Sequence, residues 1–345
     1  DWLTQYPIKI RTLPTLAEIL SGKHQADDLR EIDIDDLLGR STVPPDRALL
    51  QQMVSGRAIL VTGAGGSIGS ELCREIMTLS PRVLVLYEQN EFALYNIHRE
   101  LAASGQVVPI LASIADEPSL VEALRKHSVD VLFHAAAHKH VPLVEENVLQ
   151  GVRNNVFGTV TVVKAAFEHG VQNFVLISSD KAVRPTNVMG ATKQWSELVV
   201  AHYAERALLE GRNQKFCAVR FGNVLGSNGS VVPLFREQID KGGPITLTHP
   251  DMTRYFMSIH EAAELIIQAA ALSEGGDVLL LEMGQPIRIT DLAHNMIRLA
   301  GQTVRDAQNP GGSIGIVTTG IRPGEKMYEE MFYEEGSAET TAHPK

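Results

Sequence analysis

Short runs of branched apolar residues alternate with amphipathic stretches through the middle of the chain. The apolar runs are bounded by polar residues or glycine, as buried strands usually are, and cover residues 58–61, 83–86, 107–111, 131–133, 174–177 and 216–221. Helical patterns lie between them, at residues 71–79, 117–127, 155–168 and around 191–198. We therefore predict an α/β fold with a doubly wound parallel sheet whose two faces are covered by helices.

The first apolar run leads into a glycine-rich turn, Thr62-Gly63-Ala64-Gly65-Gly66-Ser67-Ile68-Gly69-Ser70. Its glycines let the backbone approach a pyrophosphate at the positive end of the following helix. Glu88 closes the next strand, where a carboxylate accepts hydrogen bonds from a ribose 2′-hydroxyl and repels a 2′-phosphate. Strand, turn, helix and acidic residue together predict a dinucleotide site that prefers NAD to NADP. The alternative is a glycine turn without a ligand.

The fourth apolar run ends in His134-Ala135-Ala136-Ala137-His138-Lys139-His140. Three small alanines at a strand end again allow close approach of a cofactor. The histidines raise the question of a metal ion, but no cysteine or carboxylate accompanies them at a useful spacing. We therefore predict no metal site.

A polar cluster, Ser178-Ser179-Asp180-Lys181, follows the fifth run. It stands at the carboxyl end of a strand, where open α/β sheets bind ligands. Met189 and Lys193 are four residues apart in a helical stretch, so they share one face. The pattern predicts a hydroxyl, a carboxylate and two amines around one ligand. A solvated loop with a surface charge pair is the alternative.

The regular alternation weakens after residue 221. Glycine-rich loops carry Asn223, Arg254 and Arg322, which suit a lobe that grips a phosphorylated, polyhydroxylated ligand. Surface arginines in solvated turns are the alternative. The further elements predicted are strands at 245–247, 253–257 and 278–281 and helices at 233–241, 260–272, 289–300 and after 326.

These patterns divide the chain into four parts. The first is a lead-in segment (1–50), with helix candidates at 16–20 and 46–54. The second is a nucleotide-binding Rossmann domain (51–215), to which strand 216–221 returns. A smaller lobe (222–335), mainly substrate-binding and with segments returning to the core, and a disordered tail (336–345) complete the chain.

Composition restricts the partners and the compartment. The formal charge of -10 without any basic block argues against a nucleic-acid partner. The only cysteines, Cys73 and Cys217, stand in apolar contexts, which favours reduced thiols in the cytoplasm. No long apolar run is present, so we expect no membrane contact by this part of the protein. Because the chain opens at Asp1, we expect it to be a piece of a longer polypeptide.

Several linked motifs between residues 50 and 332 resemble one superfamily. The glycine-rich turn resembles the fingerprint of the extended short-chain dehydrogenases/reductases. The narrower motifs resemble UDP-N-acetylglucosamine 4,6-dehydratases, in particular their membrane-anchored CapD/WbpM-like branch; they are Asp180-Lys181-Ala182-Val183, Pro185-Thr186-Asn187, Met189-Gly190-Ala191-Thr192-Lys193, Arg220-Phe221-Gly222-Asn223-Val224-Leu225, His138-Lys139-His140-Val141-Pro142 and Arg322-Pro323-Gly324-Glu325-Lys326.

The motifs and the resemblance together assign the candidate site residues. The catalytic group is Ser179, Asp180, Lys181, Met189 and Lys193. The cofactor group is Gly63, Gly66, Ser67, Ile68, Gly69, Glu88, Ala135, Ala136, Ala137, Asn155 and Lys193. The substrate group is Lys139, Asn223, Arg254, Arg322 and Glu325. Met189 stands where most of the superfamily has tyrosine, and its thioether cannot act as an acid or a base; the WbpM-like branch shares this methionine.

The resemblance implies an NAD-dependent lyase that converts UDP-N-acetylglucosamine to a UDP-4-keto-6-deoxy-N-acetylhexosamine, with retention at carbon 5, for bacterial surface polysaccharide. A UDP-sugar 4-epimerase is one alternative, and a non-catalytic NAD-binding protein is another. The Asp180–Lys181 pair favours dehydration, and Lys193 with the polar loops argues for catalysis. The resemblance further implies a homo-oligomer and a cytoplasmic domain whose parent protein is anchored in the inner membrane.

Overall fold

The computed structural model describes residues 11–12, 30–31, 43–334 and 338–345. Most of the lead-in segment, including the helix candidate at 16–20, lies outside these residues. Arg11–Thr12 (β1) pairs antiparallel with Arg30–Glu31 (β2). The second helix candidate is confirmed as α2 (Arg47–Val54), which begins where the Asp46 side chain accepts hydrogen bonds from the backbone of Ala48 and Leu49.

The main sheet has seven strands, all parallel, in the order β13-β8-β7-β6-β3-β4-β5. This confirms the doubly wound fold, and the six predicted strands all belong to it. The strands are β3 (Ala58–Thr62), β4 (Val83–Glu88), β5 (Val107–Leu111), β6 (Val131–His134), β7 (Asn173–Ile177), β8 (Lys215–Arg220) and β13 (Val278–Leu280). The seventh strand, β13, comes from far along the chain and extends the sheet beside β8.

Alternate residues of each strand supply two separate cores. In β3, Ile59 and Val61 face one core, and Ala58 and Leu60 face the other. The first core is covered by α2, α3 (Ser67–Thr78), α4 (Glu91–Leu101) and α11 (Ile259–Leu272), and the second by α5 (Glu117–His127), α8 (Gly158–Glu168) and α9 (Val188–Leu209). Burial on both faces explains why the strands read as unbroken apolar runs.

The helices differ from the sequence pattern in three places. Helix α4 was not predicted, because Phe92 and Tyr95 are exposed and blur its apolar stripe. Helix α6 (Val141–Glu146) was not predicted either. The helix expected at 155–168 begins earlier and is not uniform: α7 (Val148–Gly151) and a π-helical turn η3 (Val152–Phe157) precede α8, which covers only the later part of the expected range.

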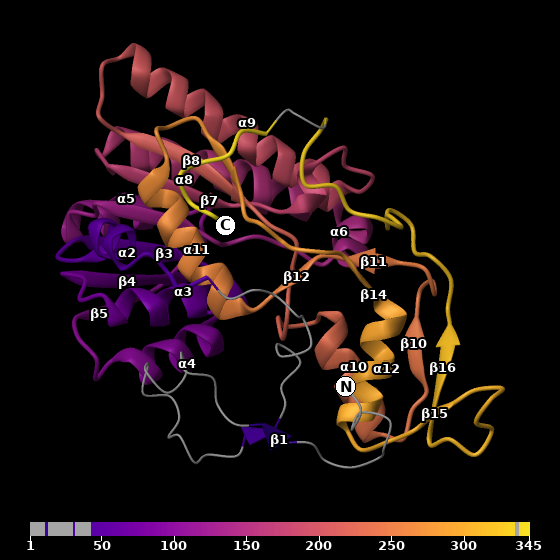
Figure 1. Cartoon of the computed structure of the whole chain (residues 1–345). Helices are drawn as coiled ribbons and strands as arrows, with labels where there is room; N and C mark the ends of the chain where they lie inside the picture. Colours follow the sequence, from indigo (N-terminus) through magenta and orange to yellow (C-terminus); the bar gives the residue numbers. More distant parts are fainter. Residues whose placement is uncertain (1–10, 13–29, 32–42, 335–337) are drawn as a thin grey trace.

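A third core organises a smaller lobe beside the sheet (Figure 1). It lies between α10 (Val231–Asp240), α12 (Ile289–Leu299) and a three-stranded parallel sheet of β10 (Ile245–Leu247), β16 (Ile314–Thr318) and β15 (Val304–Arg305). The single strand expected at 253–257 is two short strands with different partners. They are β11 (Thr253–Arg254), paired with β14 (Ile287–Arg288), and β12 (Phe256–Met257), paired with β9 (Asn223–Val224).

The end of the chain returns to the large core, and the helix expected there was wrong. No helix follows residue 326 in the described part of the chain, because backbone carbonyls that a helix would use internally accept hydrogen bonds from Arg254 and Arg220 instead. Residues 338–345, part of the tail for which we predicted disorder, contain neither helix nor strand, and their last side chain lies beside two carboxylates. Lys345 Nζ lies 3.6 Å from Glu261 Oε1 and 3.3 Å from Glu282 Oε2.

None of the described helices combines the length and the apolar character that crossing a membrane requires.

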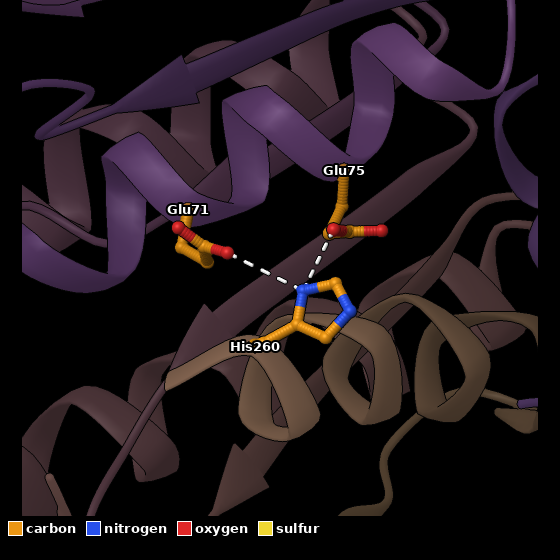
Figure 2. Close-up of side chains that lie close together, drawn as sticks. All are labelled: Glu71, Glu75 and His260. Carbon is orange, nitrogen blue, oxygen red and sulfur yellow. Dashed lines mark hydrogen bonds and ion pairs between the residues drawn. The ribbon is translucent and has the colours of Figure 1, made fainter. Parts of the chain in front are cut away.

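Helix α11 is fixed to α3 by an imidazole between carboxylates (Figure 2). His260 Nδ1 lies 2.8 Å from Glu75 Oε1 and 3.3 Å from Glu71 Oε1, and Nε2 lies 3.5 Å from Glu264 Oε1. Hydrogen bonds to Glu71 and Glu75 raise the pKa of His260 from 6.5 to about 10, against the effect of partial burial. These side chains also bring possible metal ligands within 4.8 Å of one another. Carboxylates beside both ring nitrogens are nevertheless the surroundings of a protonated imidazole, which has no free lone pair to offer a metal ion.

This ion pair predicts a pH-dependent contribution to stability. Because folding raises the pKa of His260, its contribution is complete below pH 6.5 and disappears as the pH rises through about 10. His260→Gln should therefore lower the unfolding free energy most near pH 6.5, and the deficit should shrink towards pH 10. Urea unfolding of both proteins between pH 6 and 10.5 measures this difference. A deficit that stays constant over that range would contradict the assignment.

Candidate active site

The carboxyl edge of the sheet contains a crevice where the strand order changes direction. From β3 the chain continues through β4 on one side, whereas β6 pairs with β3 on the other. Open α/β sheets bind ligands at such a point. A cavity of about 230 Å³ lies there. Its lining includes Gly63, Gly65, Gly66, Glu88, Asn90, Ala112, Ile114, Ala135, Ala136, Ala137 and Asn154.

The glycine-rich turn leaves no room for side chains. Gly63 has φ +66°, and a Cβ on it would lie 2.7 Å from Ala136 N. A Cβ on Gly69 would lie 2.0 Å from Gly63 O. Helix α3 starts at Ser67 and has no side-chain cap, since its N-cap residue is Gly66. The uncapped N–H groups and the bare backbone beside the cavity fit the pyrophosphate of a dinucleotide.

Glu88 forms part of the cavity wall and fixes its shape. Its Oε2 accepts from Gly65 N at 3.1 Å, and its Oε1 accepts from Asn90 N at 2.9 Å. The carboxylate thus joins the glycine turn to the start of α4. Each oxygen keeps a second lone pair, so Glu88 can still accept a bond from a ribose hydroxyl.

Asn155, assigned above to the cofactor, is occupied by the protein itself. Its Oδ1 accepts from His138 N at 2.8 Å, and its Nδ2 donates to His138 O and to Thr192 Oγ1, each at 2.9 Å. It therefore holds the alanine loop in place, and it is the neighbouring Asn154 that lines the cavity. Beneath the loop, burial and then the Lys193 charge lower the pKa of His134 to about 3, which keeps this ring neutral.

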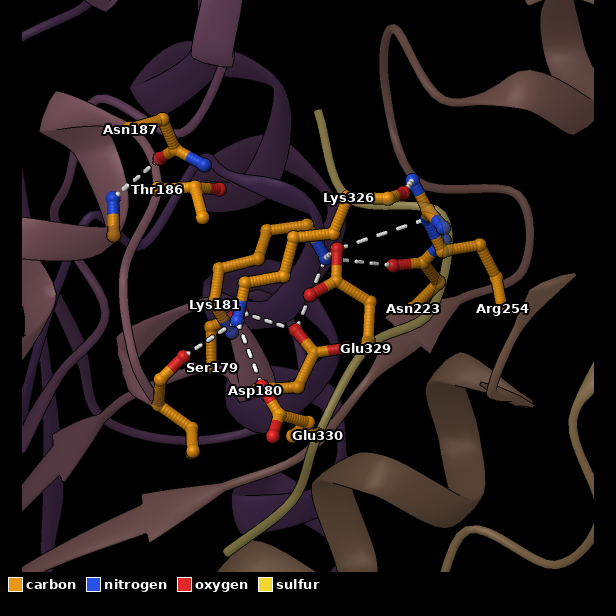
Figure 3. Close-up of polar contacts among 12 residues, drawn as sticks. Ser179, Asp180, Lys181, Thr186, Asn187, Asn223, Arg254, Lys326, Glu329 and Glu330 are labelled. Carbon is orange, nitrogen blue, oxygen red and sulfur yellow. Dashed lines mark hydrogen bonds and ion pairs between the residues drawn. The ribbon is translucent and has the colours of Figure 1, made fainter. Parts of the chain in front are cut away.

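Ser179, Asp180 and Lys181, which follow β7, contact one another through their side chains (Figure 3). Asp180 is 0% exposed. Its Oδ1 accepts from Ser179 Oγ at 2.8 Å and from Lys181 Nζ at 3.0 Å. Its Oδ2 is buried and has no hydrogen-bond partner within the described residues. Lys181 Nζ also donates to Asn223 Oδ1 at 3.1 Å, which connects the cluster to the smaller lobe.

Lys181 carries a charge in this arrangement. Burial alone would lower its pKa, but Asp180 and Glu329 outweigh burial and raise the pKa above its ordinary value. Glu329 Oε1 lies 3.5 Å from Lys181 Nζ. Lys139 is also close enough to interact: its pKa is lowered by burial and by the Lys181 charge. A lysine that acts as a base must be neutral, so Lys181 has to lose a proton first.

Lys193 and Met189 lie at the start of α9, as predicted. Lys193 Nζ donates to Ile177 O at 2.8 Å, at the end of β7. Burial lowers the pKa of Lys193 to about 8, although Glu197 opposes this shift. Met189 is buried. Of the two, only Lys193 can exchange a proton near neutral pH.

The two arginines assigned to the substrate have different surroundings. Arg254 is buried and turned towards the end of the chain: Nη1 donates to Thr253 O and Met327 O, and Nη2 donates to Lys326 O. With Nε 3.7 Å from Glu329, all three of its nitrogens have protein partners, so it is not placed as a free phosphate clamp. Arg322 is exposed.

Arg322 and Glu325 belong to one tight turn. Arg322 N donates to Glu325 Oε2, and Glu325 N donates to Arg322 O, each at 3.1 Å. Gly324 has φ +80°, and its carbonyl accepts from Thr186 Oγ1 and Asn187 Nδ2 at 3.0 Å. This turn therefore anchors the last segment to the loop that carries the polar cluster.

A buried ion pair below the cluster was not found from the sequence. Arg220 binds Glu197 through two nitrogens, at 2.8 and 3.2 Å, and Ser178 Oγ donates to Glu197 Oε1 at 2.5 Å. Arg220 Nη1 also donates to Met331 O. Glu197 follows Lys193 by four residues on α9, and this spacing was the one available signal.

Comparison with known proteins places the chain in a family. The model of a family described as polysaccharide biosynthesis protein matches residues 59–345, and the chain belongs to this family. It is 46% identical, over 94% of its length, to the capsular polysaccharide biosynthesis protein CapD of Staphylococcus aureus, of which it covers 53%. The chain thus spans about half the length of this relative.

More distant relatives carry two different names. A Campylobacter jejuni UDP-N-acetylglucosamine 4,6-dehydratase (inverting) is 31% identical over 83% of this chain and 80% of its own. A UDP-glucose 4-epimerase of Rickettsia canadensis is 30% identical with the same coverage. The solved structure of Pen from Bacillus thuringiensis superposes with a TM-score of 0.75 at 32% identity, covering 82% of this chain and 84% of that one. The chain is therefore an extended short-chain dehydrogenase/reductase homologue.

The buried pair predicts a large and local effect on stability. Glu197→Gln leaves the Arg220 charge unpaired in the protein interior and should lower the unfolding free energy by about 3–5 kcal/mol. Glu210→Gln removes a partner of Arg206 and Arg212 at the surface, and should lower the unfolding free energy far less, because water and salt screen such a pair. Urea unfolding compares the two variants. Equal losses of unfolding free energy in the two variants would show that the buried pair matters no more to stability than the surface pair does.

Proposed function

We propose that this domain dehydrates a UDP-N-acetylhexosamine, with UDP-N-acetylglucosamine as the substrate, to the 4-keto-6-deoxy sugar nucleotide. The proposal is supported above all by the Asp180–Lys181 pair, a buried carboxylate and a largely buried amine 3.0 Å apart just after the carboxyl end of β7. An epimerase needs only to oxidise and reduce carbon 4. A dehydratase must also remove a proton from carbon 5 and protonate the hydroxyl that leaves carbon 6, which calls for such a pair.

The cofactor that fits the cavity is NAD. The glycine turn and the start of α3 would hold its pyrophosphate, Glu88 its ribose, and the alanine loop and Lys193 its nicotinamide end. When bound, NAD supplies the acceptor and donor of hydride that a redox-neutral dehydration requires.

The residues of the cluster divide the proton transfers among them. Ser179, which already donates to Asp180, would bond the oxygen at carbon 4. Asp180 would take the proton of that hydroxyl, because Met189 cannot, and would later give it to the hydroxyl that leaves carbon 6. Its free Oδ2 is available for this contact. Lys181, once neutral, would remove the proton from carbon 5.

A single base also favours one stereochemical result. If Lys181 removes and returns the carbon 5 proton, both transfers occur on one face of the sugar, and the configuration is retained. The smaller lobe would bind the UDP part through Asn223, Arg322 and Glu325, together with Lys139 from the loop after β6. Arg254 is the weakest of the residues assigned to the substrate, because its nitrogens already bind the protein.

The surface supports the proposal that the domain forms a homo-oligomer. Phe157, Trp195 and Leu198 are exposed apolar side chains on η3 and α9, two elements in contact with each other. Apolar groups gathered in this way mark association surfaces. We further propose that the parent protein presents the domain on the cytoplasmic side of the inner membrane.

The cofactor assignment predicts a binding defect. Glu88→Ala removes the acceptor for the ribose and should weaken NAD binding by about 1–3 kcal/mol. Glu91→Ala, in the exposed first turn of α4, is the matched control and should leave binding unchanged. Titration calorimetry gives both affinities. The assignment fails if the unmodified protein binds NADP more tightly than NAD.

The elimination predicts how the two halves of the pair will differ. With UDP-N-acetylglucosamine in heavy water, the native protein should place deuterium at carbon 5 and release a 4-keto product, both measured by mass spectrometry. Lys181→Met should abolish deuterium incorporation and water loss, because the base is gone. Asp180→Asn should stop turnover at the first step. Normal exchange at carbon 5 in Lys181→Met would exclude Lys181 as the base, and a 4-epimer without a keto product would favour the epimerase.

A further inference from the structure

Glu329 is a buried carboxylate that the proposed reaction does not yet use. Its side chain is 3% exposed. One oxygen, Oε1, lies 3.5 Å from Lys181 Nζ and 3.7 Å from Arg254 Nε. The other, Oε2, is buried without a hydrogen-bond partner in the described part of the chain. An incompletely paired carboxylate is costly to bury, so its place beside the catalytic cluster calls for an explanation.

The end of the chain is held in a way that fixes this carboxylate. Arg254 binds the carbonyls of Lys326 and Met327, and Lys326 Nζ donates to Val183 O at 2.8 Å. The segment is thus tied on one side to the smaller lobe and on the other to the loop that follows Lys181. Figure 3 shows Glu329 between Lys181 and Arg254. The hydrogen bonds that hold this segment therefore also fix the contact between the Glu329 carboxylate and the Lys181 ammonium.

The charges around Lys181 come from several elements. Asp180 adjoins it in the chain, Glu329 approaches from the last segment, and Arg254 and Lys139 are the nearby cations. Asp180 has its own proton to transfer in the proposed reaction. Glu329 is the remaining anion, and it can set the charge of Lys181 without taking part in bond changes.

We propose that Glu329 is a positioning residue of the active site, which holds the Lys181 ammonium in place and determines the pH at which this lysine becomes a base. This inference rests on the proposed function for its role in catalysis, but the contact itself does not. Removing the Glu329 charge should make Lys181 easier to deprotonate, because Asp180 alone would then oppose the effects of burial and of the Arg254 charge on this lysine. An opposite charge at this range shifts a pKa by about one to three units.

The direct test measures the pKa of Lys181 without any substrate. Competitive acetylation of the full chain over a range of pH, read by peptide mass spectrometry, gives the reactivity of each lysine. Glu329→Gln should lower the pKa of Lys181 by about one to three units. Glu329→Asp keeps the charge and should keep the pKa near that of the native protein. Glu330→Gln is the matched control, since Glu330 pairs with Arg184 and Lys326 instead and should leave Lys181 unchanged.

The second measurement is the pH profile of deuterium exchange at carbon 5. Exchange should rise with pH as Lys181 loses its proton, and Glu329→Gln should move this rise to lower pH in step with the acetylation result. An unchanged Lys181 pKa in Glu329→Gln overturns the inference even if the protein is a dehydratase. A lowered pKa without exchange from any UDP-sugar overturns the proposed function and leaves the contact established.

Discussion

A charged amine that is largely buried must be surrounded by acceptors, and this requirement organises the polar cluster around Lys181. The three partners of Lys181 Nζ come from three separate parts of the chain: Asp180 beside it, Asn223 from the smaller lobe and Glu329 from the last segment. Charge burial costs several kcal/mol unless it is compensated. The site is therefore complete only when the sheet, the lobe and the end of the chain are assembled.

The parallel sheet supplies the position at which this assembly takes place. Its strands finish in register, with Thr62 opposite His134 and His134 opposite Leu176, so residues far apart in sequence emerge along one edge. Two backbone segments approach each other very closely at this edge, because a Cβ on Gly63 would lie 2.7 Å from Ala136 N. Small residues at positions 63 and 136 thus let the glycine turn pack closely against the loop that follows β6.

Features governed by local rules could be predicted from the sequence. Short-range patterns predict the buried strands, the glycine turn, Glu88 at the end of β4 and the cluster at 178–181. The last three lie at the carboxyl ends of their strands, as expected. Features that depend on a distant partner could not be predicted. Arg254 looked like a phosphate ligand, yet its nitrogens bind the backbone of residues 326 and 327. Asn155 looked like a cofactor ligand, yet it holds the loop at His138.

Dependence on a distant partner also explains why the Glu329 and Glu197 carboxylates were not found from the sequence. Nothing in the sequence around Glu329 or Glu197 shows that these side chains are buried, because each is paired with an arginine from another element, Arg254 and Arg220 respectively. Each arginine also binds a carbonyl of the last segment.

Two buried charge pairs thus hold one stretch of backbone against the site. Removing one partner of such a pair is far more costly than the pair is stabilising. The position of the last segment is consequently coupled to the charges beneath it. A change in the charge of Lys181 would therefore act on the segment that carries Glu329, through their contact at 3.5 Å.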